Sequence, residues 1–453
     1  MLYWLITKLL GWAVALFYDV ELTGPGIVPG PVLVTPNHPN MGVDALVIFH
    51  TGGRQTRWLG KAPLFEQAFV GSVLRKLGGL PVYRKQDYPD RMHLNEETFD
   101  AAINQLMSGE AILIHPEGKS HSAPSMTPLR TGAARIALQA EERSGWSLDL
   151  KVQPVGLTYE RKPFFRGRAV AAYGEPIAVT SYRDRYSKDD REAARALTQD
   201  IRQGLFAVTL QMETTEDREL VDFAERIWAR EKGGARPTER QKFAERLPRM
   251  QTFALAYTRL RSENPDRVEE LRARVRRYRR IVTALGVREG DVPRRYRPGA
   301  VARYAVGQLA ILILLLPGAM VGAFFWAVPY FFTSAGVKRF SPNHDQLATY
   351  KLAIGLLAFP LWLGVVCAGL FFTMGLTPAF VVLIFAPMLG LAGVAWGVRL
   401  ASVREDVRIF LRARRRPGTR DRLGDIREGL VHDFEQIAVR WSGEDLPETY
   451  AEP

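Results

Sequence analysis

Apolar positions in the first 185 residues occur in short runs that alternate with amphipathic stretches. The short runs, each typical of a strand, are residues 31–35, 79–84, 111–115, 152–158 and 168–173. The amphipathic stretches, which have helical spacing, are residues 64–77, 95–107 and 130–143. Strands that alternate with helices predict a layered α/β domain with a mixed, largely parallel sheet. Ligands bind such sheets beyond the carboxyl ends of the strands.

The C-terminal half contains much longer apolar segments. Residues 352–398 carry no charged side chain and are long enough for two membrane-spanning helices of roughly 20 residues each. Gly375 and Pro378 lie where the chain would reverse. We therefore predict a two-helix transmembrane hairpin over residues 350–398.

The N-terminal residues 1–20 form another apolar segment. Aromatic residues lie at both of its ends, as is typical of helices at a membrane interface. A basic leader and a small-residue cleavage site, which would indicate a signal peptide, are absent. We expect a retained, membrane-associated helix.

Arginines crowd both sides of the C-terminal apolar segments. They are Arg272, Arg274, Arg276, Arg277, Arg279, Arg280, Arg294, Arg295, Arg297 and Arg303 before them, and Arg399, Arg404, Arg408, Arg412, Arg414, Arg415 and Arg416 after them. The positive-inside tendency places both clusters in the cytoplasm, which three full crossings would forbid. We expect residues 304–337 to form a re-entrant hairpin that folds at Pro317-Gly318. The alternative is a single kinked span.

Charge and cysteine content narrow the class of protein. The 453-residue chain has a formal net charge of +13, which favours an anionic partner such as a phosphate-bearing metabolite or an acidic membrane surface. The adjoining membrane segments argue against nucleic acid. With Cys367 as its single cysteine, the chain has no intrachain disulfide and no cysteine nucleophile near the predicted sheet. Abundant alanine, arginine and glycine suggest a bacterial source.

The region between the sheet and the membrane segments, residues 186–303, is basic and helical. It begins with an amphipathic helix at about residues 189–211 and is interrupted at Gly233-Gly234 and Pro265. We expect the helix at residues 189–211 to pack on the α/β domain. We prefer to interpret residues 215–300 as a belt against anionic headgroups rather than as a solvated helical bundle. Residues 399–453 would form a basic cytoplasmic tail.

A His-Asp pair is the first candidate for chemistry. His38 and Asp44 lie in the stretch NHPNMGVD directly after a predicted strand. A neutral imidazole takes a proton from a hydroxyl, and a carboxylate on its other nitrogen fixes the tautomer. The alternative is a purely structural role, in which a buried histidine forms a hydrogen bond with its neighbour.

In three further stretches, candidate site residues lie at or close to the end of a predicted strand. They are GGLPVYRK with Arg84, IHPEGKSHS with Glu117, Gly118 and Lys119, and LKVQPVGLTY with Pro154. In this order, and with YGEPI at residues 173–177, the four stretches resemble the four blocks of the glycerolipid (PlsC-like) acyltransferase family. The resemblance covers about residues 20–185. It is strongest with the glycerol-3-phosphate/dihydroxyacetone-phosphate acyltransferase branch known from fungi.

The resemblance implies an acyltransferase-type catalytic domain at residues 21–185 and a role for each block. His38 would be the general base on a glycerol hydroxyl, and Asp44 would orient it. Arg84 would bind the acceptor phosphate, Glu117 and Gly118 would shape the acceptor site, and Pro154 would shape the acyl site. The donor would be acyl-CoA or an acyl carrier protein, with neither metal nor other cofactor.

Two features depart from the family pattern. Many members have arginine where Ser120 stands, so Lys119 or Arg130 would supply that charge. His115, Glu117 and His121 lie close together in sequence, but strand-to-turn placement does not favour a metal site.

The expected protein is an integral membrane acyltransferase of the bacterial inner membrane, with its catalytic domain on the cytoplasmic face. Its reaction would add the first acyl chain to glycerol 3-phosphate or dihydroxyacetone phosphate. The alternatives are the second acylation, on lysophosphatidate, and a non-catalytic membrane scaffold.

Overall fold

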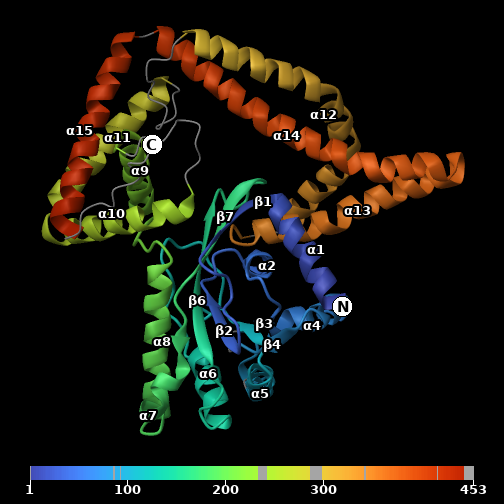
Figure 1. Ribbon diagram of the computed structural model, residues 1–453, viewed down its shortest axis with the longest axis vertical. Coiled ribbons are helices and arrows are strands. Elements are labelled where there is room, and N and C mark those ends of the chain that lie inside the picture. Colours follow the sequence, from blue (N-terminus) through green and yellow to red (C-terminus); the bar gives the residue numbers. More distant parts are fainter. Residues whose placement is uncertain are drawn as a thin grey trace. The chain divides into compact units, whose positions relative to one another are not determined.

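The computed structural model describes residues 2–84, 87–91, 93–232, 242–285, 298–340, 343–415 and 417–442. The chain divides into two compact units. The first comprises residues up to Thr215 together with Lys242–Leu247 and the segment that ends at Leu352, and the second comprises the remaining described residues. Figure 1 shows the strands, which all belong to the first unit, and the long helices of the second.

The first unit is built on an eight-stranded sheet. Its main path has the order β1-β7-β6-β2-β5-β3-β4, and β8 pairs with β6. Only β7 and β8 run antiparallel to β6, whereas every other pairing is parallel. The strands are β1 (Tyr18–Thr23), β2 (Val32–Pro36), β3 (Thr56–Lys61), β4 (Gly79–Val82), β5 (Ala111–Leu113), β6 (Lys151–Glu160), β7 (Gly167–Tyr173) and β8 (Ile177–Ala178). The predicted mixed, largely parallel sheet is confirmed.

Helices cover both faces of the sheet. One face packs against α5, α6 and α8 through a core that includes Leu33, Ile112, Leu138 and Leu197. On the other side, α1 packs on α2, and α2 contacts β7. The helices of this unit are α1 (Leu2–Phe17), α2 (Gly42–Thr51), α3 (Ala62–Phe65), α4 (Ala68–Lys76), α5 (Leu94–Met107), α6 (Gly132–Arg143), α7 (Arg183–Tyr186) and α8 (Asp190–Ala207), with short 3₁₀ helices at Pro89–Arg91 and Val179–Tyr182.

The first unit extends beyond residues 21–185 at both ends. At the amino end, α1 packs on α2 and leads directly into β1, so residues 1–20 are part of the unit. At the other end, the unit continues past residue 185 because α8 packs against β6 and α6. The α8 helix starts at a true N-cap, where the Asp189 carboxylate accepts from the backbone N–H groups of Arg191 and Glu192.

Four helices of the second unit share an aromatic core. They are α9 (Thr215–Lys232), α10 (Phe243–Glu263), α11 (Pro265–Leu285) and α15 (Pro417–Ser442). Phe223 of α9 lies 5.8 Å from Tyr278 of α11 and 6.2 Å from Phe434 of α15, measured between ring centroids. An apolar centre of this kind is typical of a helical bundle.

Arginines on α11 form ion pairs with acidic residues of the same unit. Arg272 pairs with Asp217, Arg274 with Asp433, and Arg279 with Glu219. Three of the arginines assigned to the headgroup-binding belt are therefore paired within the protein. The aromatic core agrees with the alternative of a helical bundle, and the belt stays a prediction.

Three apolar helices complete the second unit. They are α12 (Pro298–Phe340), α13 (Leu347–Met374) and α14 (Leu376–Arg415), and each has a stretch long and apolar enough to cross a membrane. Because α12 is one helix with Pro317 inside it, the hairpin expected at Pro317-Gly318 is not formed. The reversal expected between the last two helices lies at Gly375, where φ is +91°.

Indole N–H groups link these apolar helices. Each tryptophan donates to a backbone carbonyl of another helix at 2.9 Å: Trp326 to Ala386, Trp362 to Phe325, and Trp396 to Leu312. The three indoles are half-buried, and a polar N–H group in an apolar setting favours such an acceptor.

Some sequence features fall outside the described residues. They are the interruption at Gly233-Gly234, the arginines Arg294, Arg295, Arg297 and Arg416, and residues 443–453 of the tail.

Candidate active site

His38 and Asp44 meet in the turn that joins β2 to α2. His38 follows the last residue of β2 by two positions, and Asp44 lies in the first turn of α2. Their side chains are joined between His38 Nδ1 and Asp44 Oδ2 at 2.8 Å. Asp44 is fully buried, whereas the His38 side chain is 18% exposed. With Nδ1–H donating to the carboxylate, Nε2 carries the lone pair that accepts a proton.

The backbone of this turn is strained. Met41, the residue before α2, has φ +44° and ψ −129°, a conformation that costs a residue with a Cβ on the order of 1–3 kcal/mol. The neighbouring Asn40 is fully buried, and its backbone N–H donates to Asp44 Oδ2 at 2.8 Å. Surrounding contacts therefore hold a conformation that the isolated chain would rarely adopt.

Tyr159 supplies a third donor to the buried carboxylate. It lies next to the end of β6, and its hydroxyl donates to Asp44 Oδ1 at 2.7 Å. Burial, with Asp44 nearby, raises the pKa of Tyr159 well above its ordinary value. The hydroxyl therefore remains a donor across the physiological range.

His115 stacks on the face of His38. The two ring centroids are 3.7 Å apart and the planes differ by 11°. His115 Nδ1 lies 3.2 Å from the carbonyl oxygens of Pro36 and Asn37, so it carries the proton. Burial first, and the proximity of His38 second, lower the pKa of His115 well below its ordinary value. The neutral His115 ring thus stacks on the His38 imidazole.

Glu117 links the stretch IHPEGKSHS to the stretch NHPNMGVD, which contains His38. Its Oε1 accepts from the backbone N–H of His38 at 2.8 Å, and its Oε2 accepts from His121 and from the backbone N–H of Thr127. Burial alone would raise the pKa of the carboxyl, but these hydrogen bonds outweigh it and lower the pKa below its ordinary value. Glu117 is fully buried, and its bond to the backbone N–H of His38 fixes the position of that residue.

Cationic side chains gather around the turn at Gly118. Arg84 Nη1 lies 3.4 Å from the Gly118 carbonyl oxygen, and Arg84 Nε donates to Asp87 at 2.6 Å. Arg130 packs so close that a Cβ at Gly118 would lie 2.9 Å from its Nε. Gly118 has φ +70°, so glycine is required there for both conformation and space. Lys119 and Arg130 are exposed.

Pro154 lies away from these groups. It is buried in the middle of β6, level with Thr35 of β2, rather than at a strand end. Its ring packs against Gly204 of α8, where an added Cβ would lie 2.5 Å from Pro154 Cγ. The structure therefore gives Pro154 a packing role, and it is Tyr159 of the same sequence block that contacts the catalytic pair.

Sequence reasoning missed three residues that touch the catalytic turn. Tyr159 and His115 lie inside recognised blocks, but only the folded chain shows which of their neighbours they contact. Lys162 follows β6, and its Nζ lies 2.5 Å from the carbonyl oxygen of Pro39 and 3.3 Å from Ser122 Oγ. No local sequence signal marks Lys162.

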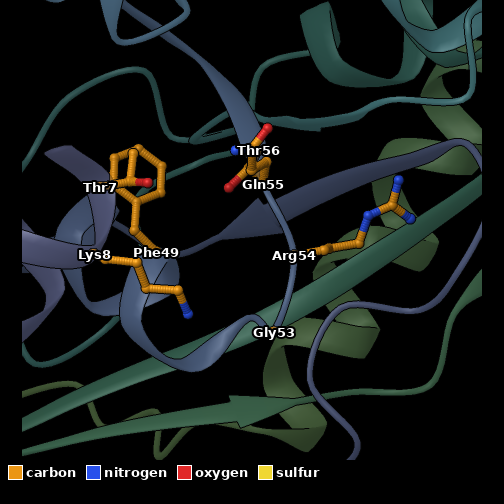
Figure 2. Close-up of a pocket in the computed structure, with 7 residues that line it drawn as sticks. All are labelled: Thr7, Lys8, Phe49, Gly53, Arg54, Gln55 and Thr56. Carbon is orange, nitrogen blue, oxygen red and sulfur yellow. The ribbon is translucent and has the colours of Figure 1, made fainter. Parts of the chain in front are cut away.

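A small cavity lies at the opposite end of the strands. Its volume is about 50 Å³, and its lining includes Thr56, the first residue of β3, with Lys8 and Phe49. Figure 2 shows Arg54 extending away from Lys8, and the guanidinium donates to the carbonyl oxygens of Val28, Gly30 and Gly109. The cavity is too small for an acyl donor. Within the described ranges, no cluster of three or more His, Cys, Asp and Glu side chains is placed to hold a metal ion.

The class of this domain follows from its sequence. Residues 19–158 match the family model named Acyltransferase, a range that runs from β1 into β6 and includes His38, Asp44, Arg84 and Glu117. The chain therefore contains an acyltransferase domain, and the resemblance stated from the four blocks is confirmed.

Curated relatives point in the same direction. An uncharacterized acyltransferase of Schizosaccharomyces pombe is 24% identical over 458 residues, which cover 78% of this chain and 65% of that protein. Glycerol-3-phosphate O-acyltransferase 2 of Saccharomyces cerevisiae is 35% identical over 135 residues, or 30% of this chain and 18% of the yeast protein. The chain thus spans less than two thirds of the length of these relatives.

A solved structure aligns with part of this chain. The 1-acyl-sn-glycerophosphate (LPA) acyltransferase PlsC from Thermotoga maritima aligns with 46% of this chain and 81% of its own, at 16% identity and a TM-score of 0.33.

Proposed function

We propose that this protein is a membrane-bound acyltransferase of phospholipid biosynthesis. It transfers a fatty acyl group from acyl-CoA or an acyl carrier protein to the sn-1 hydroxyl of glycerol 3-phosphate or dihydroxyacetone phosphate. The observation that carries the proposal is the 2.8 Å hydrogen bond between His38 and the buried Asp44, inside a domain that matches the acyltransferase family. Glycerol 3-phosphate is favoured because two yeast relatives bear its name.

His38 is the general base in this mechanism. Its Nε2 takes the proton of the acceptor hydroxyl as the oxygen attacks the thioester carbonyl. Asp44 stabilises the imidazolium that forms, and the donors on both carboxylate oxygens keep Asp44 ionised. Glu117 fixes the backbone of His38 so that the ring stays in register with the acceptor.

Collapse of the tetrahedral intermediate completes the transfer. The carbon–sulfur bond breaks, and the thiolate leaves with the proton that the imidazolium returns to it. The products are the acyl ester and the free thiol, and His38 is again neutral. The protein forms no covalent bond with the acyl group in this scheme.

The acceptor phosphate is assigned to the cations around Gly118. Arg84 is held there by Asp87, and the exposed Arg130 and Lys119 complete the cluster. Guanidinium groups bind phosphate through paired N–H donors, which suits a small phosphorylated alcohol.

The membrane is the second partner. Three helices are long and apolar enough to cross it, and an acylated product partitions into lipid. We assign the catalytic unit to the cytoplasmic face of a bacterial inner membrane, where acyl-CoA and acyl carrier protein are found. The composition of the chain supports the bacterial assignment.

An acceptor assay tests the proposal. Purified protein in phospholipid vesicles receives a radiolabelled acyl-CoA with glycerol 3-phosphate, dihydroxyacetone phosphate or lysophosphatidate, and the products are separated by chromatography. We expect labelled lysophosphatidate from the first acceptor. Transfer to lysophosphatidate alone would assign the second acylation instead, and no transfer from any donor, including acyl carrier protein, would favour a scaffold.

The His38→Ala variant tests the assigned base. Loss of general base catalysis should reduce kcat by about 10²–10⁴-fold while the protein remains folded. The matched control is His432→Ala, which replaces an exposed histidine in α15. Wild-type turnover in His38→Ala would show that the imidazole is not the base.

A further inference from the structure

One apolar helix begins inside the catalytic unit. Residues 343–352, which include the start of α13, group with the sheet domain, whereas α13 from residue 353 onward belongs to the helical unit. The helix has a stretch that is long and apolar enough to cross a membrane. This short segment is therefore covalently continuous with a candidate membrane span.

Three side chains of this segment contact three different loops of the site. Asp345 Oδ2 accepts from Ser120 Oγ at 2.6 Å, Thr349 Oγ1 donates to the Asn40 carbonyl oxygen at 3.3 Å, and Lys351 donates to the Pro163 carbonyl oxygen. Ser120 follows Glu117 by three residues, Asn40 follows His38 by two, and Pro163 follows Tyr159 by four. The first two loops carry a residue of the catalytic network, and the third directly follows the strand that carries Tyr159.

The contact at Thr349 bears directly on the strained turn. The backbone N–H of Asn40 donates to Asp44, and its carbonyl accepts from Thr349, so both sides of the peptide chain at Asn40 are held. Thr349 also packs on the start of α2, because a Cβ at Gly42 would lie 3.1 Å from Thr349 Cγ2. Between these positions lies Met41, whose φ of +44° requires support from its surroundings.

We propose that Thr349 and Asp345 are positioning residues of the catalytic site. They hold the turn between His38 and Asp44 and the loop after Glu117 in the geometry that transfer requires, and so make catalysis depend on how α13 begins. Ser120, which stands where many family members have arginine, is then the docking point for Asp345. The inference rests on the proposed function for its kinetic test only.

The Thr349→Val variant removes the hydroxyl and keeps the shape of the side chain. We expect kcat to fall about five- to thirtyfold, as for loss of a partly buried hydrogen bond, with the KM for both substrates unchanged. Thr349→Ser, which keeps the hydroxyl, should restore most of kcat. The matched control is Thr373→Val in the same helix, whose hydroxyl bonds the Gly369 carbonyl of its own helix at 2.7 Å and which should retain wild-type kcat.

A parallel pair tests the second contact. Asp345→Ala removes the acceptor for Ser120 and should reduce kcat, whereas Asp345→Asn keeps an oxygen at that position and should retain most of it. This pair also serves if Thr349→Val does not fold, as judged by thermal unfolding in detergent. Wild-type kcat in both Thr349→Val and Asp345→Ala, or an equal loss in Thr373→Val, would overturn the proposal.

A chemical measurement separates this inference from the proposed function. Diethyl pyrocarbonate modifies exposed imidazoles, and peptide mass spectrometry reports the rate at His38 relative to the exposed His432. Thr349→Val should accelerate modification of His38 severalfold by loosening its turn, whether or not the protein transfers acyl groups. An unchanged rate ratio would reject the positioning role. If no acceptor is acylated by the wild type but the ratio changes, only the proposed function fails.

Discussion

At the scale of single residues, the Asp44 carboxylate organises the site. It receives three hydrogen bonds, from the His38 ring, the Asn40 backbone and the Tyr159 hydroxyl. Two donors come from the turn after β2 and the third from the end of β6, so the carboxylate joins these two parts of the fold. Because Asp44 is fully buried, these donors take the place of water around its carboxylate oxygens.

Tyr159→Phe should weaken this organisation without removing the base. The variant leaves Asp44 Oδ1 without its tyrosine donor, so the carboxylate holds the imidazole less firmly. We expect kcat to fall about tenfold, with acceptor KM unchanged. Steady-state kinetics measure both values. Tyr173→Phe is the control, because Tyr173 is also buried but its hydroxyl contacts Thr51 at 2.9 Å. Equal losses in the two variants would refute a specific role for Tyr159.

His115 should make stability depend on pH. Its pKa is lowered in the folded protein, so between the ordinary value of 6.5 and the lowered one the unfolded chain binds a proton that the native state does not. Stability is fully present above pH 6.5 and falls as the pH decreases below it, by up to about 1.4 kcal/mol per pH unit. Thermal unfolding across this range should show a shallower dependence in His115→Phe, which retains a ring under His38. A slope equal to the wild type would contradict this assignment.

The sequence identified the residues of the site whose role can be seen in a local stretch. His38 and Asp44 are six positions apart, so a turn was enough to predict their contact. Tyr159 and Thr349 reach the same turn from positions more than 100 residues away, and their contacts depend on the tertiary fold. Pro154 shows the converse, because a proline in a strand resembles a site feature but here serves packing.

At the scale of elements, β6 and α8 fit together through a proline and a glycine. Pro154 lacks a backbone N–H, and it lies between the positions where β6 pairs with β8 and with β7, so no ladder bond is lost there. Its ring fills the space left by Gly204 in α8. Glycine in a helix costs stability, and here it permits a close approach to the sheet.

Gly204→Ala should destabilise the catalytic unit despite the better helix propensity of alanine. The new methyl group would lie 2.5 Å from Pro154 Cγ, and overpacking of this kind costs about 1–3 kcal/mol. A lower thermal unfolding midpoint is expected, with partial recovery in Gly204→Ala combined with Pro154→Ala. The control is Gly424→Ala in α15, where nothing lies within 4 Å of the added Cβ. An unchanged midpoint in Gly204→Ala would show that the helix and sheet separate easily.

Helices and strands were predicted correctly where a single hydrophobic periodicity dominated the segment. The five predicted strands are all present, and α5 and α6 lie close to their expected bounds. Strand β1 was missed because α1 leads into it without a break, and α2 because it is short and mostly apolar. At α12, Pro317-Gly318 suggested a reversal, but the helix continues through the proline.

At the scale of the whole molecule, the net charge does not show which basic residues are paired within the protein. The chain has an excess of 13 positive charges, yet arginines of α11 pair with acids of the same unit. A more deeply buried pair joins Arg249 of α10 to Glu225 of α9 at 2.6 Å, with side chains 1% and 0% exposed. Internal pairing uses equal numbers of positive and negative charges, so it leaves the net excess of 13 unchanged. The ion pairs decide only which basic residues carry that excess.

Glu225→Gln should unfold the helical bundle more readily. It removes the carboxylate that pairs with the buried Arg249 guanidinium, and breaking a buried ion pair typically costs about 3–5 kcal/mol. Circular dichroism during thermal unfolding should show an earlier loss of helix. Glu219→Gln, which breaks an exposed pair with Arg279, should change stability by less than about 1 kcal/mol. Comparable losses in the two variants would mean that burial does not set the strength of these pairs.

The three tryptophan bonds between the apolar helices have a mechanical consequence. Each indole is matched to one carbonyl on another helix, and in hydrocarbon no water is present to take over if that carbonyl moves away. A slide of one helix along its neighbour would break these bonds with nothing to replace them. When the thickness of the bilayer changes, the three helices should therefore tilt together as one rigid body.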